Sequence, residues 1–303
     1  MAKRRTREDR EALPTGYGFR VTHADFASAH LGTSRTLTIN LPPGYDDDPT
    51  RRYPVLYLHD GQNLFEDHRA AYGVSWRAGE IADRLTTEGR IRPILLVGID
   101  NSEAREDEYA VYPDDWTESG GRGDEHARVI VEEVKPFVDR EYRTLPGRAD
   151  TAIAGSSMGG LASLTTAWQH PGVFGMCAML SPSLWWAKGR VLDELGQDAR
   201  WMRRMRFWLC MGTHEEDPLG QITPDLEHAR RLVELFDGAG LIPGRDYLYW
   251  EVAGGEHNEA AWSARFDKVL LYFFGVRGVE DCPCPIEEAS AIIPPSESPE
   301  AGT

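Results

Sequence analysis

The sequence has little of what a disulfide scaffold, a membrane protein or a polyanion-binding protein needs. Its 303 residues include 4 cysteines, too few for a disulfide framework in a chain of this length. No uninterrupted apolar run reaches the roughly 20 residues that a membrane-spanning helix requires. The formal net charge is −16, which disfavours nucleic acid and acidic lipid surfaces as partners. We therefore expect no nucleic-acid partner and no membrane association.

Familiar cofactor and metal motifs are also lacking. The sequence has no Gly-x-x-x-x-Gly-Lys phosphate loop, no dinucleotide fingerprint and no metal-binding spacing of His and Cys. Cys282 and Cys284 offer two ligands, and two ligands do not make a site. The charged segment Met1 to Arg10 is not followed by the apolar stretch of a signal peptide. We predict that the protein needs no cofactor or metal and is cytoplasmic.

The two ends of the chain differ in composition from its centre. Residues 1–12 are mostly charged, and residues 278–303 carry five prolines among Glu and Ser with little apolar periodicity. Such segments bury too little apolar surface to fold. We therefore predict disordered tails at 1–12 and 278–303 and a single domain at 13–277.

Strand patterns and helix patterns alternate within that domain. Residues 35–41 alternate apolar and polar as a half-exposed strand does, whereas 54–59 and 93–100 are continuously apolar, as in strands covered on both faces. Further strands are predicted at 151–155, 175–180, 207–211 and 247–252, and helices at 124–138, 224–236 and 258–274. This alternation predicts an α/β fold with a mostly parallel central sheet, helices on both faces and antiparallel N-terminal strands at one edge.

A candidate nucleophile lies where the strand at 151–155 turns into a helix. The pattern Gly155-x-Ser157-x-Gly159 occupies that turn, and its small flanking residues let strand and helix pass closely. The Met158 amide begins the helix, where the helix dipole favours developing negative charge. We predict that Ser157 is a nucleophile and that the Met158 N–H is an oxyanion donor. The alternative is a glycine-rich turn with an idle serine.

A serine nucleophile needs a base, and histidine can accept a proton near neutral pH. His257 follows the last strand and a glycine-containing loop, as a triad in the chain order serine, acid, histidine requires. The acid should follow the strand at 207–211, where Glu215, Glu216 and Asp217 stand together. Such a carboxylate orients the imidazole and stabilises the imidazolium. Spacing alone does not choose among the three, and we select Glu215.

The loop after the strand at 54–59 should supply the second oxyanion donor. It reads Asp60-Gly61-Gln62-Asn63, and Gly61 permits a tight turn that would aim the following N–H into the site. We predict that Gln62 donates through its backbone and that Asp60 shapes the loop. His59, at the end of the strand, is expected to support the same loop.

Aromatic residues on the same side of the sheet are candidates for substrate contact. Trp185 and Trp186 follow a strand end, where folds of this kind place their sites. Residues 103–123 form a long polar and aromatic segment, and long loops in compact domains are often functional. We predict that Trp185, Trp186 and Tyr109 bind substrate. Packing in the core is the alternative for the two tryptophans.

Six motifs, in order, resemble the "Putative esterase" family, which includes siderophore esterases, esterase D, feruloyl esterases and mycolyltransferases. The motifs are Tyr57–Phe65, Val97–Asn101, Gly155–Gly160, Leu180–Trp186, Gly212–Glu215 and Gly255–Trp262. The resemblance runs from about residue 17 to 275 and implies the α/β-hydrolase fold. It also implies that Ser157, His257 and Glu215 form the catalytic triad and that Gln62 belongs to the oxyanion hole.

The resemblance implies a serine carboxylesterase that acts on a small-molecule ester, with a siderophore ester or a short or aromatic acyl ester as substrate. An acyltransferase of the mycolyltransferase type is one alternative, and the lack of an export signal argues against it. A non-catalytic binding module on the same fold is another, and the intact pair of Ser157 and His257 argues against that.

Overall fold

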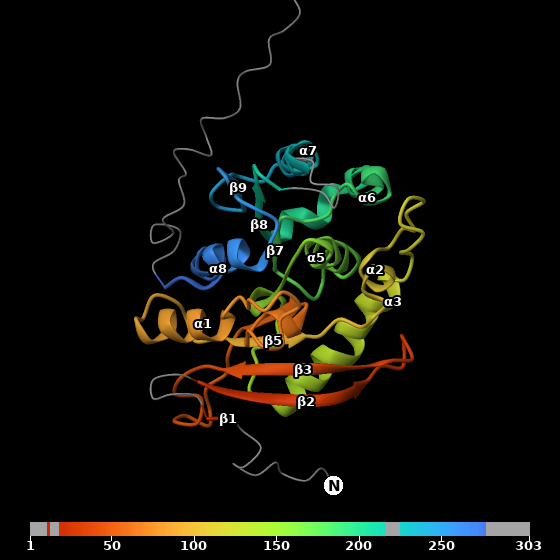
Figure 1. Ribbon diagram of the computed structural model, residues 1–303. Coiled ribbons are helices and arrows are strands. Elements are labelled where there is room, and N and C mark those ends of the chain that lie inside the picture. Colours follow the sequence, from red (N-terminus) through yellow and green to blue (C-terminus); the bar gives the residue numbers. More distant parts are fainter. Residues whose placement is uncertain (1–10, 13–17, 216–224, 277–303) are drawn as a thin grey trace, which may run out of the picture.

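The computed structural model describes residues 11–12, 18–215 and 225–276. A nine-stranded sheet of order β1-β2-β3-β5-β4-β6-β7-β8-β9 forms its centre, with β2 and β3 at one end and β8 and β9 at the other (Figure 1). The strands are β1 (Glu11–Ala12), β2 (Phe19–Ala27), β3 (Ser34–Leu41), β4 (Val55–His59), β5 (Leu95–Ile99), β6 (Thr151–Ser156), β7 (Met176–Leu180), β8 (Arg206–Gly212) and β9 (Tyr247–Val252). Pairing is antiparallel from β1 to β5 and parallel from β5 to β9.

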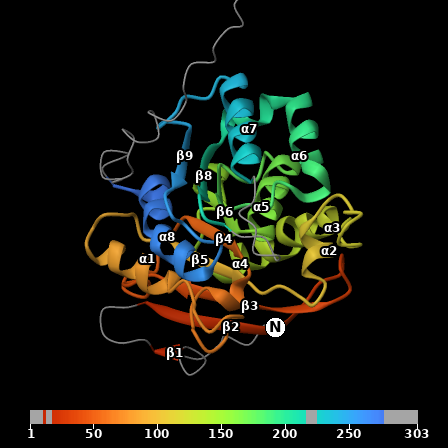
Figure 2. The same ribbon diagram turned by 45° about the horizontal axis from the view of Figure 1, so that its top comes forward.

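Helices cover both faces of the sheet. One face carries α1 (Ala78–Thr87) and α8 (Glu259–Phe274), which pack side by side (Figure 2). The other carries α2 (Arg105–Tyr109), α3 (Gly123–Arg128), α4 (Lys135–Glu141), α5 (Met158–Gln169), α6 (Trp186–Gln197) and α7 (Asp225–Gly238). A π-helical segment, Val129–Val134, joins α3 to α4.

The period of two in the strands produces two apolar layers. In β4, Leu56 and Leu58 join the core under α1 and α8, whereas Val55 and Tyr57 join the core under α5. All five residues of β4 and of β5 are buried, as the continuously apolar sequences require. The rigid sheet therefore fixes the positions at which its strands end.

The predicted α/β fold, its mostly parallel sheet and its antiparallel N-terminal edge are confirmed. The predicted tail at 1–12 is wrong for Glu11 and Ala12, whose backbones pair with Arg20 and Phe19 of β2. Two residues are too short for strand periodicity to reveal. The predicted tail at 278–303 lies outside the described residues. Among the described residues, no helix is long and apolar enough to cross a membrane.

Candidate active site

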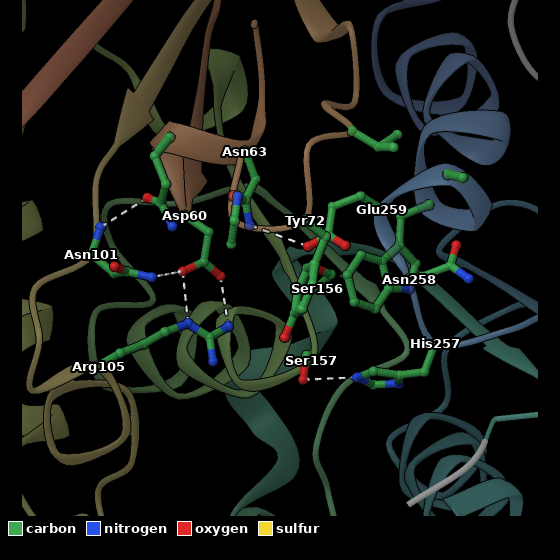
Figure 3. Close-up of a pocket in the computed structure, with 15 residues that line it drawn as sticks. Asp60, Asn63, Tyr72, Asn101, Arg105, Ser156, Ser157, His257, Asn258 and Glu259 are labelled. Carbon is green, nitrogen blue, oxygen red and sulfur yellow. Dashed lines mark hydrogen bonds and ion pairs between the residues drawn. The ribbon is translucent and has the colours of Figure 1, made fainter. Parts of the chain in front are cut away.

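The residues selected from the sequence come together at the carboxyl ends of the parallel strands. Ser157 follows β6, Glu215 follows β8 and His257 follows β9. The short 3-10 helix Gly61–Asn63 follows β4 at the same edge. Parallel strands place all their carboxyl ends on one side of the sheet, so residues up to 100 positions apart meet there (Figure 3).

Ser157 stands in a strained turn between β6 and α5. Its φ and ψ are 54° and −127°, a region that side chains other than glycine rarely occupy. The turn is tight: a Cβ added to Gly155 would lie 2.4 Å from the carbonyl oxygen of Gly159. The Ser157 amide donates to the Leu180 carbonyl of β7 at 3.0 Å, which ties the turn to the sheet. This is the geometry of a nucleophile elbow.

A continuous chain of hydrogen bonds links the serine to a buried carboxylate. Ser157 Oγ lies 2.9 Å from His257 Nε2, and His257 Nδ1 lies 3.0 Å from Glu215 Oε2 (Figure 3 shows the first of these contacts). An ionised carboxylate only accepts hydrogen bonds, so His257 carries its proton on Nδ1 and Nε2 is free to accept the serine proton. The order and spacing match a serine–histidine–acid triad.

Glu215 is held by more than the histidine. Its side chain is 4% exposed, and Oε1 accepts hydrogen bonds from the Gly212 amide at 2.6 Å and from the Ser181 hydroxyl. Burial of a carboxylate is costly unless donors compensate it, and here three groups do so. The sequence alternatives Glu216 and Asp217 lie outside the described residues.

The loop after β4 is shaped by a charged pair as well as by glycine. Asp60, rather than Gly61, adopts the left-handed conformation, with φ 55° and ψ 49°. Gly61 is needed for close approach instead, because a Cβ there would lie 2.7 Å from the backbone of β5 at Ile99. The glycine therefore permits the turn through its lack of a side chain and not through a left-handed conformation. Gln62 lies beyond this turn and lines the cavity that contains Ser157.

Asp60 forms a bidentate ion pair inside the site. Both carboxylate oxygens lie 2.7 Å from the Arg105 guanidinium, and Asn101 Nδ2 donates to Oδ1 at 2.7 Å (Figure 3). Burial alone would raise the pKa of Asp60, but the charge and hydrogen bonds of Arg105 lower it below its usual value. Asp60 is therefore an anion, and Arg105 is presented to the cavity by a partner that also fixes the loop.

A cavity of about 680 Å³ opens over Ser157 and His257. Asp60, Asn101 and Arg105 contribute polar side chains to its lining, and its rim carries Tyr72, which is 81% exposed, and Val74, which is 43% exposed. Glu259 also lines it, and burial, together with the charge of Asp60, raises the pKa of this carboxyl above its usual value. The cavity can therefore receive an ester whose polar groups meet these polar side chains and whose apolar group packs against the rim.

The three residues selected for substrate contact do not line this cavity. Tyr109 is fully buried, and its hydroxyl accepts a hydrogen bond from the Asp60 amide at 3.2 Å. Trp186 is 3% exposed and donates from Nε1 to the Tyr112 carbonyl. Trp185 is half-buried and packs on Trp116. Contact of Trp185, Trp186 and Tyr109 with substrate stays a prediction, while Tyr109 supports the loop in this structure.

A buried pair of histidines underlies the elbow. His59 Nε2 lies 3.1 Å from His126 Nε2, and His59 Nδ1 lies 3.0 Å from Ser163 Oγ. Ser163 donates to the Gly159 carbonyl, so it accepts from His59, and His126 must supply the proton between the two rings. Burial lowers the pKa of His59 to about 4 and that of His126 well below its usual value. Both rings are therefore neutral supports.

This pair predicts a loss of stability in acid. In the unfolded chain His59 takes up a proton near pH 6.5, whereas in the folded protein it does so only near pH 4. Because the unfolded state binds the proton first, the free energy of unfolding falls as the pH drops between these values. The contribution is about 3 kcal/mol. Asp83 and Asp100, whose pKa values burial raises to about 6, act in the opposite sense.

The measurement therefore compares variants. Urea unfolding from pH 7 to pH 4 should show the stability gap between wild type and His59→Asn narrowing by about 3 kcal/mol. The exposed His68→Asn serves as the control and should track wild type. A gap that stays constant across this range would show that His59 is not held neutral.

Several residues of the site were not selected from the sequence. They are Asn101, Arg105, Ser181, Ser183, Tyr72, Glu259 and Trp262. Most fall inside the recognised motifs, but their contacts depend on how the loops fold over one another. Within the described part of the chain, no group of three or more His, Cys, Asp or Glu side chains could hold a metal ion.

Comparison with known proteins gives a consistent result. Residues 28–273 match the model of the family described as "Putative esterase". The chain is 27% identical over 164 residues to the uncharacterized protein YbbA of Bacillus subtilis, covering 52% of this chain and 61% of that protein. It is 26% identical over 245 residues to the iron(III) salmochelin esterase of Escherichia coli O6:H1, covering 73% of this chain and 53% of that enzyme.

Solved structures agree on the fold. A ferulic acid esterase superposes with a TM-score of 0.65 at 18% identity, covering 84% of this chain and 97% of that chain. Identity at this level supports the fold alone.

Proposed function

The chain belongs to the "Putative esterase" family, and we propose that it is a serine carboxylesterase that forms an acyl-enzyme on Ser157. The observation that carries the proposal is the chain of hydrogen bonds from Ser157 through His257 to Glu215. A non-catalytic module would have no need to keep this order of groups at 2.9 and 3.0 Å beside an open cavity. We also place the protein in the cytoplasm, as the sequence predicts.

The reaction proceeds in two acyl-transfer steps. His257 Nε2 removes the Ser157 proton while Oγ attacks the ester carbonyl, and the backbone amides of Met158 and Gln62 stabilise the oxyanion. The tetrahedral intermediate collapses as His257 passes that proton to the leaving alcohol. Water then repeats the sequence: His257 takes its proton, hydroxide attacks the acyl-enzyme, and Ser157 recovers the proton as the acid departs. Glu215 keeps the imidazole in one tautomer throughout.

The substrate we propose is a small ester with a short or aromatic acyl group. A cavity of about 680 Å³ has room for such a molecule, and its apolar rim at Tyr72 and Val74 would pack against an aromatic ring. The comparison proteins include an iron(III) salmochelin esterase, which is named for an iron-binding ester, and a ferulic acid esterase, which is named for an aromatic acid. A catecholate siderophore ester is therefore the more specific candidate within this class.

A substrate panel tests the proposal. p-Nitrophenyl esters of increasing acyl length should be measured beside a ferric and an iron-free catecholate triester, with Ser157→Ala as the blank. We expect turnover of the short and aromatic esters, with water as the acyl acceptor. A clear preference for long acyl chains, or transfer of the acyl group to added sugar in place of hydrolysis, would favour the acyltransferase alternative.

The rim offers a separate prediction about binding. Tyr72→Ala should raise KM for p-nitrophenyl benzoate about fivefold and leave kcat nearly unchanged, because the ring would contact substrate and transition state equally. The comparison variant is Trp116→Ala, whose side chain is 68% exposed and packs on Trp185. If Trp116→Ala raises KM and Tyr72→Ala does not, the acyl group binds on the Trp185 side, as predicted from the sequence.

A further inference from the structure

A second chain of hydrogen bonds reaches Glu215 from the opposite side to His257. Trp262 of α8 lies 3.0 Å, through Nε1, from Ser181 Oγ, and the Ser181 hydroxyl contacts Glu215 Oε1. All three side chains are buried: the exposed fractions of the residues are 4% for Trp262, 1% for Ser181 and 3% for Glu215. Solvent therefore does not compete for these contacts.

The direction of this chain is fixed by chemistry. An indole N–H can only donate, and an ionised carboxylate can only accept. The Ser181 hydroxyl must therefore accept from Trp262 and donate its own proton to Glu215. A hydroxyl that accepts a hydrogen bond is a better donor, so Trp262 strengthens the contact that Ser181 makes with the carboxylate.

Ser181 has a backbone conformation that is unfavourable for a serine. Its φ of 47° lies in the left-handed region, which costs a residue other than glycine of order 1 kcal/mol or more. The Ser181 amide donates to the Cys210 carbonyl at 2.8 Å, which holds this conformation against β8. In this conformation the Ser181 hydroxyl lies between Trp262 of α8 and the loop that carries Glu215.

Trp262 also contacts the other partner of Glu215 directly. Its ring meets the His257 ring edge to face, with centroids 4.9 Å apart and planes at 83°. One side chain thus touches the imidazole and, through Ser181, restrains the carboxylate. We propose that Trp262 and Ser181 are positioning residues that hold the Glu215–His257 pair in its productive geometry, an inference that rests on the proposed function.

Two single variants and their combination test this relay. Trp262→Phe keeps an aromatic ring beside His257 and removes the indole donor, while Ser181→Ala removes the hydroxyl. Each should lower kcat about 10-fold and change KM less than about twofold, because Trp262→Phe keeps an aromatic ring at the cavity wall and Ser181 does not line the cavity. The double variant should be no worse than Ser181→Ala alone, since both changes break one chain of contacts.

The pH profile separates positioning from a general loosening of the fold. Ser181→Ala removes the hydroxyl that donates to Glu215, and Trp262→Phe weakens it as a donor, so in both variants Glu215 carries more negative charge on the oxygen facing His257 and the imidazole keeps its proton to higher pH. The acid limb of kcat/KM should therefore move up by about 0.3–0.5 pH unit in both single variants. A loosened site would lose activity equally at every pH.

Controls make each outcome decisive. Trp201→Phe is the matched change, because in the described structure its buried indole nitrogen has no hydrogen-bond partner, and it should leave kcat and the pH profile as in wild type. If Ser157→Ala is inactive while Trp262→Phe and Ser181→Ala match wild type, or if their losses multiply in the double variant, the relay is overturned and the proposed function stands. If Ser157→Ala remains active, the proposed function and the relay both fall. Should Trp262→Phe not fold, Ser181→Ala alone carries the test.

Discussion

Replacing Ser157 by alanine is expected to lower kcat for p-nitrophenyl acetate by at least about 10⁴-fold, because no acyl-enzyme can form without the hydroxyl. The residual rate should come from the oxyanion donors and from binding alone. The change removes one half-buried oxygen from a turn whose tight approach the flanking glycines already permit, so the fold should persist. The measurement is steady-state hydrolysis, with circular dichroism as the check on folding.

Ser183→Ala is the matched comparison. Its hydroxyl lies 3.3 Å from Ser157 Oγ in the same site, yet it has no hydrogen bond to His257 in the described structure. This variant should lose far less activity than Ser157→Ala. Near-normal turnover by Ser157→Ala, or a larger loss in Ser183→Ala, would show that the elbow serine is not the nucleophile.

The second large effect is expected at Glu215. Glu215→Ala should lower kcat by up to about 10⁴-fold, since the carboxylate fixes the His257 tautomer and stabilises the imidazolium. Glu215→Gln should also be severely impaired, because its amide can donate to Nδ1 and so favour the unproductive tautomer. The Glu215 side chain is only 4% exposed, so in either variant bulk water cannot readily take over the hydrogen bond to His257.

Glu216→Ala and Asp217→Ala provide the comparison for that loss. Both follow Glu215 directly in the sequence and should retain most activity. If either costs more than Glu215→Ala, the acid has been assigned one or two positions too early. If all three changes are mild, the enzyme acts with a Ser157–His257 dyad.

The sequence predicted the parallel part of the fold well because these strands are buried on both faces. β4 and β5 lie in continuous apolar runs, and short runs of that kind are typical of strands covered on both faces. The first strands were harder to predict. β2 is interrupted by an irregular pairing between His23 and Phe26, and its buried positions include the polar residues Arg20 and His23, so its apolar alternation is weak.

The site shows the same division between local and tertiary information. Ser157 and His257 were found because the elbow and the late loop are local patterns with fixed order along the chain. Arg105 and Ser181 were missed because their importance arises from contacts with Asp60 and Glu215, which lie 45 and 34 positions away. No local spacing encodes such contacts. Tyr109 was assigned to substrate because an aromatic residue in a long loop has no local sign of burial.

The most direct test of the account is the site of covalent modification. The protein should be treated with a fluorophosphonate probe and digested, and the modified peptide should be identified by mass spectrometry. We expect a single adduct on Ser157, absent from Ser157→Ala and greatly slowed in Glu215→Ala, because the probe reports the activated hydroxyl itself. An adduct on another serine, or an unmodified protein that still hydrolyses esters, would contradict a mechanism through Ser157.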